Sequence, residues 1–290
     1  MSMWRTLLRK SGFPTASSPS SRAPSTEAGP GQTPAMRAAS LERTLNEHIE
    51  QLGHDDSRTI TARNNLAGKY AQIGRRDAAV SQFEQALAEA SRVFGEDHPQ
   101  TDVIRENLAW SYEDASRPAE AAYQWETLLN HRDRRLGPVS ADTVAARARL
   151  AVCYRKSGRY SAAIAHFERA IEDSAVPEER EDLRIGLSVA FGAVGRHDDT
   201  IQQLRIVHAQ RTRRLGSKQH DTLVIQHRLG RAYNQAGRSG EAIDTLGSAY
   251  RNGIGASGDP EIRMLTLKIR RDLAGALSAA GRHREAANLF

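Results

Sequence analysis

The chain is short of cysteine and lysine, and it contains no long apolar run. Cys153 is the single cysteine among 290 residues, which excludes an intramolecular disulfide and any cysteine-based zinc site. A chain without disulfides suits a reducing cytosol, so we expect a cytoplasmic location. No run of 18 apolar residues occurs, so we expect no helix that spans a membrane.

Positive charge is abundant but unevenly placed. The formal net charge is +6, and arginine outnumbers lysine 36 to 5, a ratio typical of a codon bias that lowers the information in any one arginine. Residues 1–39 alone carry a net +4, which leaves +2 for the remaining 251 residues. A domain so close to neutral lacks the broad basic face of a dedicated nucleic-acid binder, so nucleic acid is an unlikely partner.

The N-terminal residues 1–35 are basic and rich in serine and proline. From Pro14 to Pro34 the composition cannot bury enough apolar surface to offset chain entropy, so we expect a flexible tail. The run "MWRTLLRK" is compatible with two interpretations. It is either a frayed end or a short amphipathic docking peptide for a membrane or a partner.

Two kinds of turn recur with one period. The junction glycines are Gly53, Gly95, Gly137, Gly216 and Gly258, with gaps of 42, 42, 79 and 42 residues. A second series reads "QIGRRDAA", "DASRPAEAA", "KSGRYSAA", "AVGRHDDT", "QAGRSGEA" and "AAGRHREA". The shared period indicates internal repeats of about 42 residues, the fourth of which is shortened.

Each repeat has the pattern of two helices. Leu108, Ala109 and Tyr112 form one apolar stripe, and similar triplets begin at Leu66, Leu150, Leu187, Leu229 and Leu273. Thr101, or Asp221 with Thr222, is expected to cap the first helix, and a left-handed glycine is expected to end it. A second helix follows, with Phe83 or Phe167 facing the first.

The units resemble tetratricopeptide repeats. The 42-residue period with "GEDHPQT" and "NLAWSY" resembles the subtype found in kinesin light chains and their bacterial relatives. The resemblance covers roughly residues 40–290 and implies an all-α fold, a right-handed superhelical solenoid of helix–turn–helix hairpins. The solenoid is expected over residues 36–290, with a capping helix at 37–52 and about six repeats, the last one incomplete.

The resemblance also implies a peptide-binding groove lined by the first helices. In the family, the asparagine of the "NLA" motif contacts peptide backbone, and Asn65 and Asn107 match it. The residues expected in the groove are Asn64, Asn65, Asn107, Trp110, Arg149, Arg155, Lys156, His227, Arg228, Arg231, Asn234, Lys268 and Arg271. At each single position, a solvated helix face with codon-biased arginine is an equally good interpretation.

Charge in this groove is expected to be segregated. Glu106, Glu113 and Asp114 lie beside Trp110 in repeat two, whereas repeats three, five and six are basic. The expected ligand is therefore an extended or short helical protein segment that is acidic where it meets repeats three to six. Trp110 is expected to bury one apolar anchor.

Three function classes remain open. The first is a non-enzymatic scaffold that binds a partner's peptide; the second is a regulatory or sensor module; the third is nucleic-acid binding. Self-association is possible through the C-terminal end, where a helix over 284–290 is expected to leave Leu273 and Leu277 exposed.

Motifs for chemistry are weak, and no catalytic, cofactor-binding or metal-binding residue is expected. The glycines of "NGIGASG" have the spacing of a dinucleotide fingerprint but follow a helical pattern rather than a strand. No histidine has the spacing of a metal site, and Cys153 beside Tyr154 is best interpreted as a buried thiol.

Overall fold

A computed structural model describes residues 33–256 and 258–290, and within them it consists of thirteen helices with no strand. The all-α prediction is confirmed. The expected tail at 1–35 lies outside the described residues except for its last three, and two of those already belong to the first helix. The helices are α2 (Pro34–Leu52), α3 (Ser57–Gln72), α4 (Arg76–Phe94), α5 (Pro99–Asp114), α6 (Pro118–Leu136), α7 (Ala141–Lys156), α8 (Tyr160–Asp173), α9 (Pro177–Ala193), α10 (His197–Leu215), α11 (His220–Gln235), α12 (Ser239–Ile254), α13 (Pro260–Ala279) and α14 (His283–Ala287).

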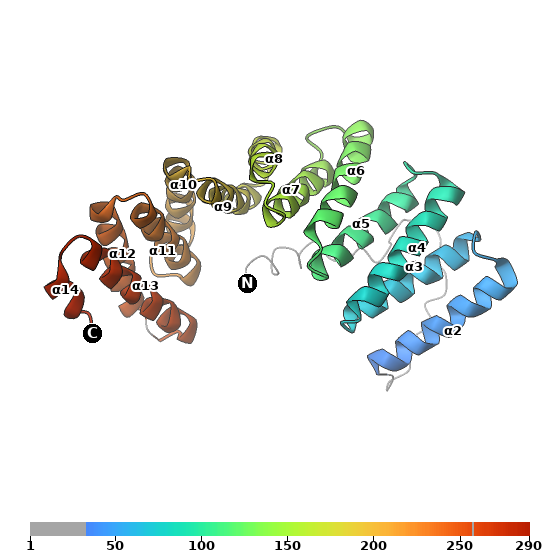
Figure 1. Ribbon diagram of the computed structural model, residues 1–290, viewed down its shortest axis with the longest axis horizontal. Helices are drawn as coiled ribbons and strands as arrows, with labels where there is room; N and C mark the ends of the chain where they lie inside the picture. Colours follow the sequence, from blue (N-terminus) through green and yellow to red (C-terminus); the bar gives the residue numbers. More distant parts are fainter. Residues whose placement is uncertain (1–32, 257) are drawn as a thin grey trace.

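The helices form a curved row in which each one packs mainly on its neighbours in sequence (Figure 1). The pairs α3/α4 to α13/α14 are the six hairpins, repeats one to six. Figure 1 places α7 and α9 on the inner side of the arc and α8 on its outer side. This arrangement is the helical solenoid that the periodicity predicts. No helix of the described residues is long and apolar enough to cross a membrane.

Every hairpin turn is closed in the same way. Five hairpins place a glycine with φ between +73° and +79° after the first helix, and Ser116 takes that conformation in repeat two. The next residue is always arginine. Its backbone N–H donates to the carbonyl five residues earlier, as Arg159 does to Tyr154 at 2.8 Å, which is a standard helix-ending bond.

The turn arginines also use their side chains. The guanidinium of Arg159 lies over the Tyr154 ring, 4.1 Å from its centroid, and the equivalent arginines of repeats one, two, four and five cover their own aromatic residue similarly. Such cation–π contacts contribute about 0.5–1 kcal/mol at exposed sites. These arginines therefore have a defined structural role, and codon bias does not account for them.

The junctions between hairpins differ from the prediction. The N-cap of α5 is His98, whose ring Nδ1 accepts from the backbone N–H two residues on, at 3.2 Å. Thr101 lies inside the helix, fully buried, and its hydroxyl donates to a backbone carbonyl six residues earlier at 2.8 Å. Asp221 and Thr222 are likewise inside α11. The predicted caps are wrong: the Thr101 hydroxyl bonds backward to the preceding junction, and the Thr222 hydroxyl is buried without a hydrogen-bond partner.

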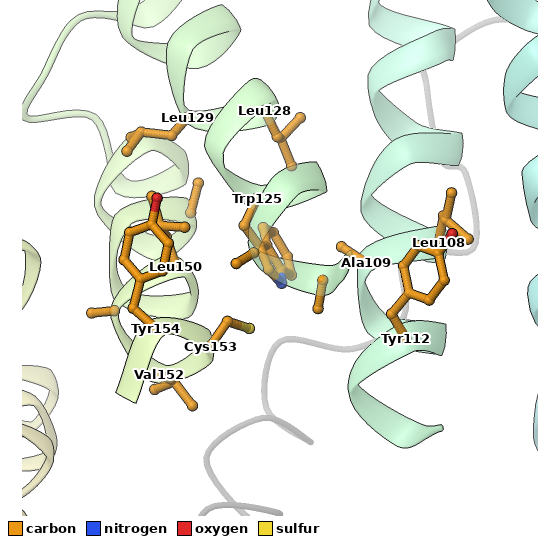
Figure 2. Packing of buried hydrophobic residues seen from close by; sticks show 14 of the residues in the cluster. Leu108, Ala109, Tyr112, Trp125, Leu128, Leu129, Leu150, Val152, Cys153 and Tyr154 are labelled. Carbon is orange, nitrogen blue, oxygen red and sulfur yellow. The ribbon is translucent and has the colours of Figure 1, made fainter. Parts of the chain in front are cut away.

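The core consists mainly of leucine, alanine and aromatic residues between the helices, in two large clusters and one small one. Figure 2 shows Trp125 of α6 between Leu108 of α5 and Leu150 of α7, and all three are almost fully buried. Burying one such large side chain contributes about 1.5–3 kcal/mol. The stripe predicted from the sequence therefore makes the core.

The last hairpin departs from the prediction in one respect. Leu273 and Leu277 are each only 4% exposed, so the expected open face does not include them. The exposed apolar side chains at this end are Met264, Leu267 and Phe290. α14 has five residues and packs on α13 through the buried Ala286.

Candidate functional site

The first helices carry equivalent residues at fixed offsets from the leucine of each repeat. We call the residues one before, two after and five after that leucine the inner face. From repeat one to repeat six these are Asn65, Gly68, Ala71; Asn107, Trp110, Glu113; Arg149, Val152, Arg155; Gly186, Val189, Gly192; Arg228, Arg231, Asn234; and Asp272, Gly275, Ser278. Most of the groove residues expected from the sequence lie on this face or directly beside it.

In repeats one and two, the side chains connect neighbouring hairpins. The Asn107 side-chain amide donates to the Asn64 oxygen at 3.0 Å, so the two expected groove residues are brought together. Asn65 is exposed on the same helix as Asn64. Asn107 therefore already has one internal partner, whereas Asn65 presents its amide to solvent.

Trp110 lies in a packed cluster rather than free on the surface. Its ring meets Trp125 edge-on, with centroids 5.7 Å apart, and the Arg149 guanidinium covers it at 3.8 Å. Arg149 is buried, which lowers its pKa to about 10, and its Nη2 has no hydrogen-bond partner. Arg149 thus covers the Trp110 ring, on which an apolar side chain of a ligand was expected to pack.

The acidic part of repeat two is largely neutralised internally. The buried Glu113 accepts from the Trp125 indole at 3.0 Å and lies 3.5 Å from the Lys156 ammonium and 3.9 Å from Arg149. Glu106 is paired with Arg132 of α6 at 2.5 Å. The expected segregation of charge therefore holds only in part, because Lys156 and Arg149 both lie near Glu113 in this cluster.

The inner face of repeat four carries almost no side chains. α9 presents Gly186, Val189 and Gly192 at the positions that hold asparagine, arginine, tryptophan or glutamate elsewhere. A Cβ at Gly186 would lie 2.6 Å from the Phe167 ring, so close packing against α8 requires glycine there. Val189 is 42% exposed.

Arg155 lies on α7 and Arg228 on α11, the first helices of the repeats before and after that of α9. The buried Nε of Arg155 has no hydrogen-bond partner. Arg228 is half-buried, and its pKa is lowered first by burial and then by the charges of Arg211, Arg155 and Arg231. No acidic group is among the causes that act on Arg228, whereas the neighbouring Arg211 and Arg231 each lie near a carboxylate.

The residues of repeats five and six divide into paired and exposed ones. His227 is buried, and its Nε2 lies 2.8 Å from the Asp272 carboxylate of α13. Burial lowers its pKa although Asp272 opposes that effect. Arg231 is 3.7 Å from the same carboxylate but mostly exposed. Asn234, Lys268 and Arg271 are exposed.

A polar cluster that the sequence did not predict lies under Arg228. Arg211 of α10 bonds to Glu181 at 3.1 Å and to Asp182 at 3.2 Å, both on α9. Burial raises the pKa of Asp182 to about 6, against the attraction of Arg211. Glu181 and Asp182 belong to the "SAVPEERED" segment that replaces the long junction of repeat four. This departure from the repeat pattern was the only sequence signal for the cluster.

The residues examined for chemistry have structural environments. Burial, followed by the nearby Glu113 charge, raises the pKa of the Cys153 thiol, which disfavours the reactive thiolate. The "NGIGASG" run begins in the last turn of helix α12, and a Cβ at Gly253 would meet Thr266 at 2.2 Å, so packing explains that glycine. Gly258, expected as a junction glycine, is not among the left-handed ones. Within the described ranges, no three potential metal ligands come together.

Comparison with known proteins bears on the family. A tetratricopeptide-repeat family model matches residues 58–127, and a second such model matches residues 146–181. No curated protein sequence matches the chain.

Several solved structures share the fold. The kinesin-light-chain TPR-like repeats of Podosopora anserina are 24% identical, with a TM-score of 0.60 over 69% of this chain and 97% of that one. BtubC (BKLC) of P. vanneervenii is 19% identical, with a TM-score of 0.57 over 79% and 94%. YrrB, described as a TPR protein with an unusual peptide-binding site, is 17% identical, with a TM-score of 0.51 over 77% and 96%. The turns, the stacked hairpins and the two family-model matches agree that residues 58–127 and 146–181 are tetratricopeptide repeats, and the solved structures share the helical fold of the chain.

Proposed function

We propose that this protein is a non-enzymatic scaffold whose inner face binds an acidic peptide segment of a partner protein. The observation that carries the proposal is that Arg228 is half-buried and has no hydrogen-bond or ion-pair partner among the described residues. By contrast, the buried Arg63 has Glu89 at 2.9 Å, and the half-buried Arg184 has Gln203 at 2.7 Å. A guanidinium held half-buried beside other cations gains most from an anion that arrives with a ligand.

The rest of the inner face supports an extended ligand. Asn65 offers an exposed amide at the N-terminal end, and Arg231, Lys268 and Arg271 offer exposed cations at the other. A ligand that follows the helices in order would meet a polar contact first and a basic stretch after repeat two. Charges of this kind fix the orientation of a ligand and raise its association rate more than they add affinity.

The family supports the same coarse function. Tetratricopeptide repeats serve as protein-interaction scaffolds, and YrrB is described as having a peptide-binding site. Extension of that property to this chain is our proposal. No observation favours a regulatory module over a simple scaffold.

The proposal is tested by peptide selection on the immobilised full chain. A library of short random peptides should yield sequences enriched in aspartate and glutamate. The double change Arg228→Glu with Arg231→Glu should weaken binding of these peptides at least about tenfold, which corresponds to about 1.4 kcal/mol. Helix content measured by circular dichroism should not change, because both side chains lie outside the apolar core.

The matched control is Arg205→Glu with Arg213→Glu on α10, which makes the same charge change on two exposed arginines away from the inner face. This variant should bind the selected peptides as the wild type does. Selected peptides without acidic residues, or equal loss in both double variants, would contradict the proposal. Binding that falls steeply with salt and is equally good for a single-stranded oligonucleotide would favour nucleic acid instead.

A further inference from the structure

One junction of the solenoid carries exposed valines where two other junctions carry an ion pair. At the junctions before repeats one and two, the aspartate two residues after the glycine pairs with an arginine 37 residues later, as Asp97 does with Arg134 at 2.9 Å. At the junction between α6 and α7, the equivalent positions are Val139 and Val176, which are also 37 residues apart. Their exposed fractions are 66% and 42%.

The two segments that carry these valines are held together. Nη1 of Arg147 donates to the Pro138 carbonyl at 3.2 Å and to the Asp173 carboxylate at 2.5 Å. Val139 follows Pro138 directly, and Val176 lies three residues after Asp173, beyond the end of α8. One guanidinium therefore fixes the α6–α7 loop beside the α8–α9 loop.

The exposed surface of these loops is apolar beyond the valines. Leu136, the last residue of α6, is 46% exposed. Alanine and proline fill the remaining exposed positions next to the valines. Contiguous exposed apolar residues of this kind mark interaction sites on soluble proteins. We call this surface the edge patch and define it by Leu136, Pro138, Val139, Ala175, Val176 and Pro177.

The charges around the edge patch leave an excess of negative charge. The nearby exposed arginines of α6 and α8 are each bound to a carboxylate, as Arg169 is to Asp173 at 2.9 Å. Asp142 and Glu178 are exposed in the first turns of α7 and α9, and neither side chain has a hydrogen-bond or ion-pair partner within the described ranges. A helix N-terminus favours such acidic residues, but it does not account for the apolar ones between them. The surface suits a ligand with apolar and cationic side chains.

The chain has a segment of that chemistry outside the described residues. Residues 3–10 read "MWRTLLRK" and contain three cations and no acidic residue. The spacing of Met3, Trp4, Leu7 and Leu8 places the apolar side chains on one face of a helix. A helix of fewer than three turns is marginal in water, so it forms only against a surface that covers its apolar face.

The connecting chain is long enough for this segment to reach the edge patch. Residues 11–33 can span up to about 75 Å when extended. From Pro34 to the α6–α7 loop, the structure advances by the length of α2, about 28 Å, and by five interhelical steps of about 10 Å. Because these two directions are nearly perpendicular, the distance is below about 60 Å.

We propose that the edge patch is the docking site of residues 3–10 of the same chain. Trp4, Leu7 and Leu8 pack on Val139 and Val176, and the cations of the segment lie beside the two unpaired carboxylates. The covalent connection raises the effective concentration of the segment, so a small patch is enough to hold it. None of these residues belongs to the inner face, so the inference does not depend on the proposed function.

Hydrogen exchange of the full chain, resolved by mass spectrometry, tests the docking. Val139→Asp with Val176→Arg introduces the residue types of the ion pair that two other junctions use. Amides of residues 3–10 should exchange at least about tenfold faster in this variant than in the wild type. The matched control Val103→Asp with Val194→Arg makes the same changes at two exposed valines outside the edge patch, and it should leave that exchange unchanged.

A second variant tests the same contact from the side of the segment. Trp4→Ser with Leu8→Ser leaves the solenoid intact, so it remains decisive even if the patch variant unfolds. It should speed exchange of residues 137–140 and 174–176 and leave α3 and α4 unchanged. Wild-type exchange of residues 3–10 at the rate of an unstructured peptide overturns the proposal, and so does equal protection in the patch variant. Protection that increases with protein concentration would place the segment on a second copy and overturn docking within one chain.

Discussion

Gly230 shows how single residues set the distance between helices. In four of the other five repeats the position after the leucine is alanine, and in repeat four it is serine. A Cβ at Gly230 would lie 2.5 Å from Cγ of Leu246, which is itself only 1% exposed. The leucine branches too close to α11 to leave room for a methyl group.

Gly230→Ala should therefore destabilise the protein although alanine is the better helix former. Overpacking of a tight core costs about 1–3 kcal/mol, which exceeds the gain of about 1 kcal/mol in helix propensity. The control Gly275→Ala, at an exposed helical glycine with open space, should instead stabilise by up to about 1 kcal/mol. Urea unfolding followed by circular dichroism measures both; a stabilising Gly230→Ala would show that Leu246 can move aside.

Asp182 gives the stability of the protein a defined dependence on pH. Burial raises its pKa to about 6, while Arg211 and Arg214 oppose and Glu181 and Asp221 reinforce that shift. Between about pH 4 and pH 6 the folded chain holds a proton at this carboxyl that the unfolded chain has released. The contribution of Asp182 to stability therefore falls as the pH rises through this window.

Asp182→Asn should accordingly raise the melting temperature near pH 7.5, have about half that effect near pH 5, and have little effect near pH 4. The asparagine oxygen can still accept the bond from Arg211, so the geometry is retained. Asp198→Asn, at a side chain that is 91% exposed, serves as the control and should change little at any of these pH values. A difference between variant and wild type that is the same at all of these pH values would exclude titration of Asp182 as its cause.

At the scale of the element, the hairpin turn is the most regular device in the chain. Five turns place glycine in the left-handed conformation, and Ser116 adopts it with φ 60°. A residue with a Cβ pays roughly 1–2 kcal/mol in that conformation. Ser116→Gly should stabilise the protein by about 1 kcal/mol, and the reciprocal Gly158→Ser in the next hairpin should destabilise it by a similar amount. Thermal unfolding of the two variants measures both signs, and a change of the same sign in both would contradict the argument.

The elements were predictable from sequence because their signals are local. The period, the leucine–alanine–tyrosine stripe and the turn glycines each follow from residues a few positions apart. The caps were misplaced because Thr101 has a hydroxyl suited to capping, and only the packed junction shows that it bonds backward. The arginines of the turns were undervalued because an excess of arginine conceals a recurring Gly–Arg pair.

The site was predictable as a surface but not as a set of contacts. Asn64, Trp110 and Arg228 were placed near the inner face by their offsets alone. That Arg149 covers Trp110 depends on the separation of two helices that are 36 residues or more apart in the chain, which no local pattern encodes. The lack of a partner for Arg228 becomes visible only by comparison with Arg149, the equivalent arginine of repeat three, which lies 3.9 Å from Glu113.

At the scale of the whole molecule, α9 joins two hydrophobic cores. Leu183, Leu187 and Phe191 pack into the core that begins at α2, whereas Ile185 packs into the one that continues to α14. The charged cluster of Arg211, Glu181 and Asp182 lies at the same helix. Because repeats couple mainly to their neighbours, a defect on one face of α9 should affect one side of the molecule first.

Ile185→Ala should speed hydrogen exchange in α10–α13 and leave α3–α7 nearly unchanged. The loss of a buried isoleucine costs about 2–5 kcal/mol, enough to open the neighbouring block. Leu187 lies two residues away and packs into the core that begins at α2. Leu187→Ala should therefore speed hydrogen exchange in α7 and α8 instead. Hydrogen exchange resolved by mass spectrometry distinguishes the two, and uniform acceleration in both variants would mean that the chain unfolds as one unit.

Several contacts that close a hairpin turn belong to two hairpins at once. Tyr112 donates to Glu84 at 2.5 Å, and Tyr70 donates to Glu42 at the same distance, in each case on the second helix of the unit before. A hairpin copied by itself would leave its tyrosine without that glutamate. A segment that runs from the second helix of one hairpin to the first helix of the next contains both the glutamate and the tyrosine. Gene duplication, deletion or the engineering of longer arrays should therefore succeed best when the segment boundaries fall at the left-handed turns, half a unit away from the hairpins that the eye picks out.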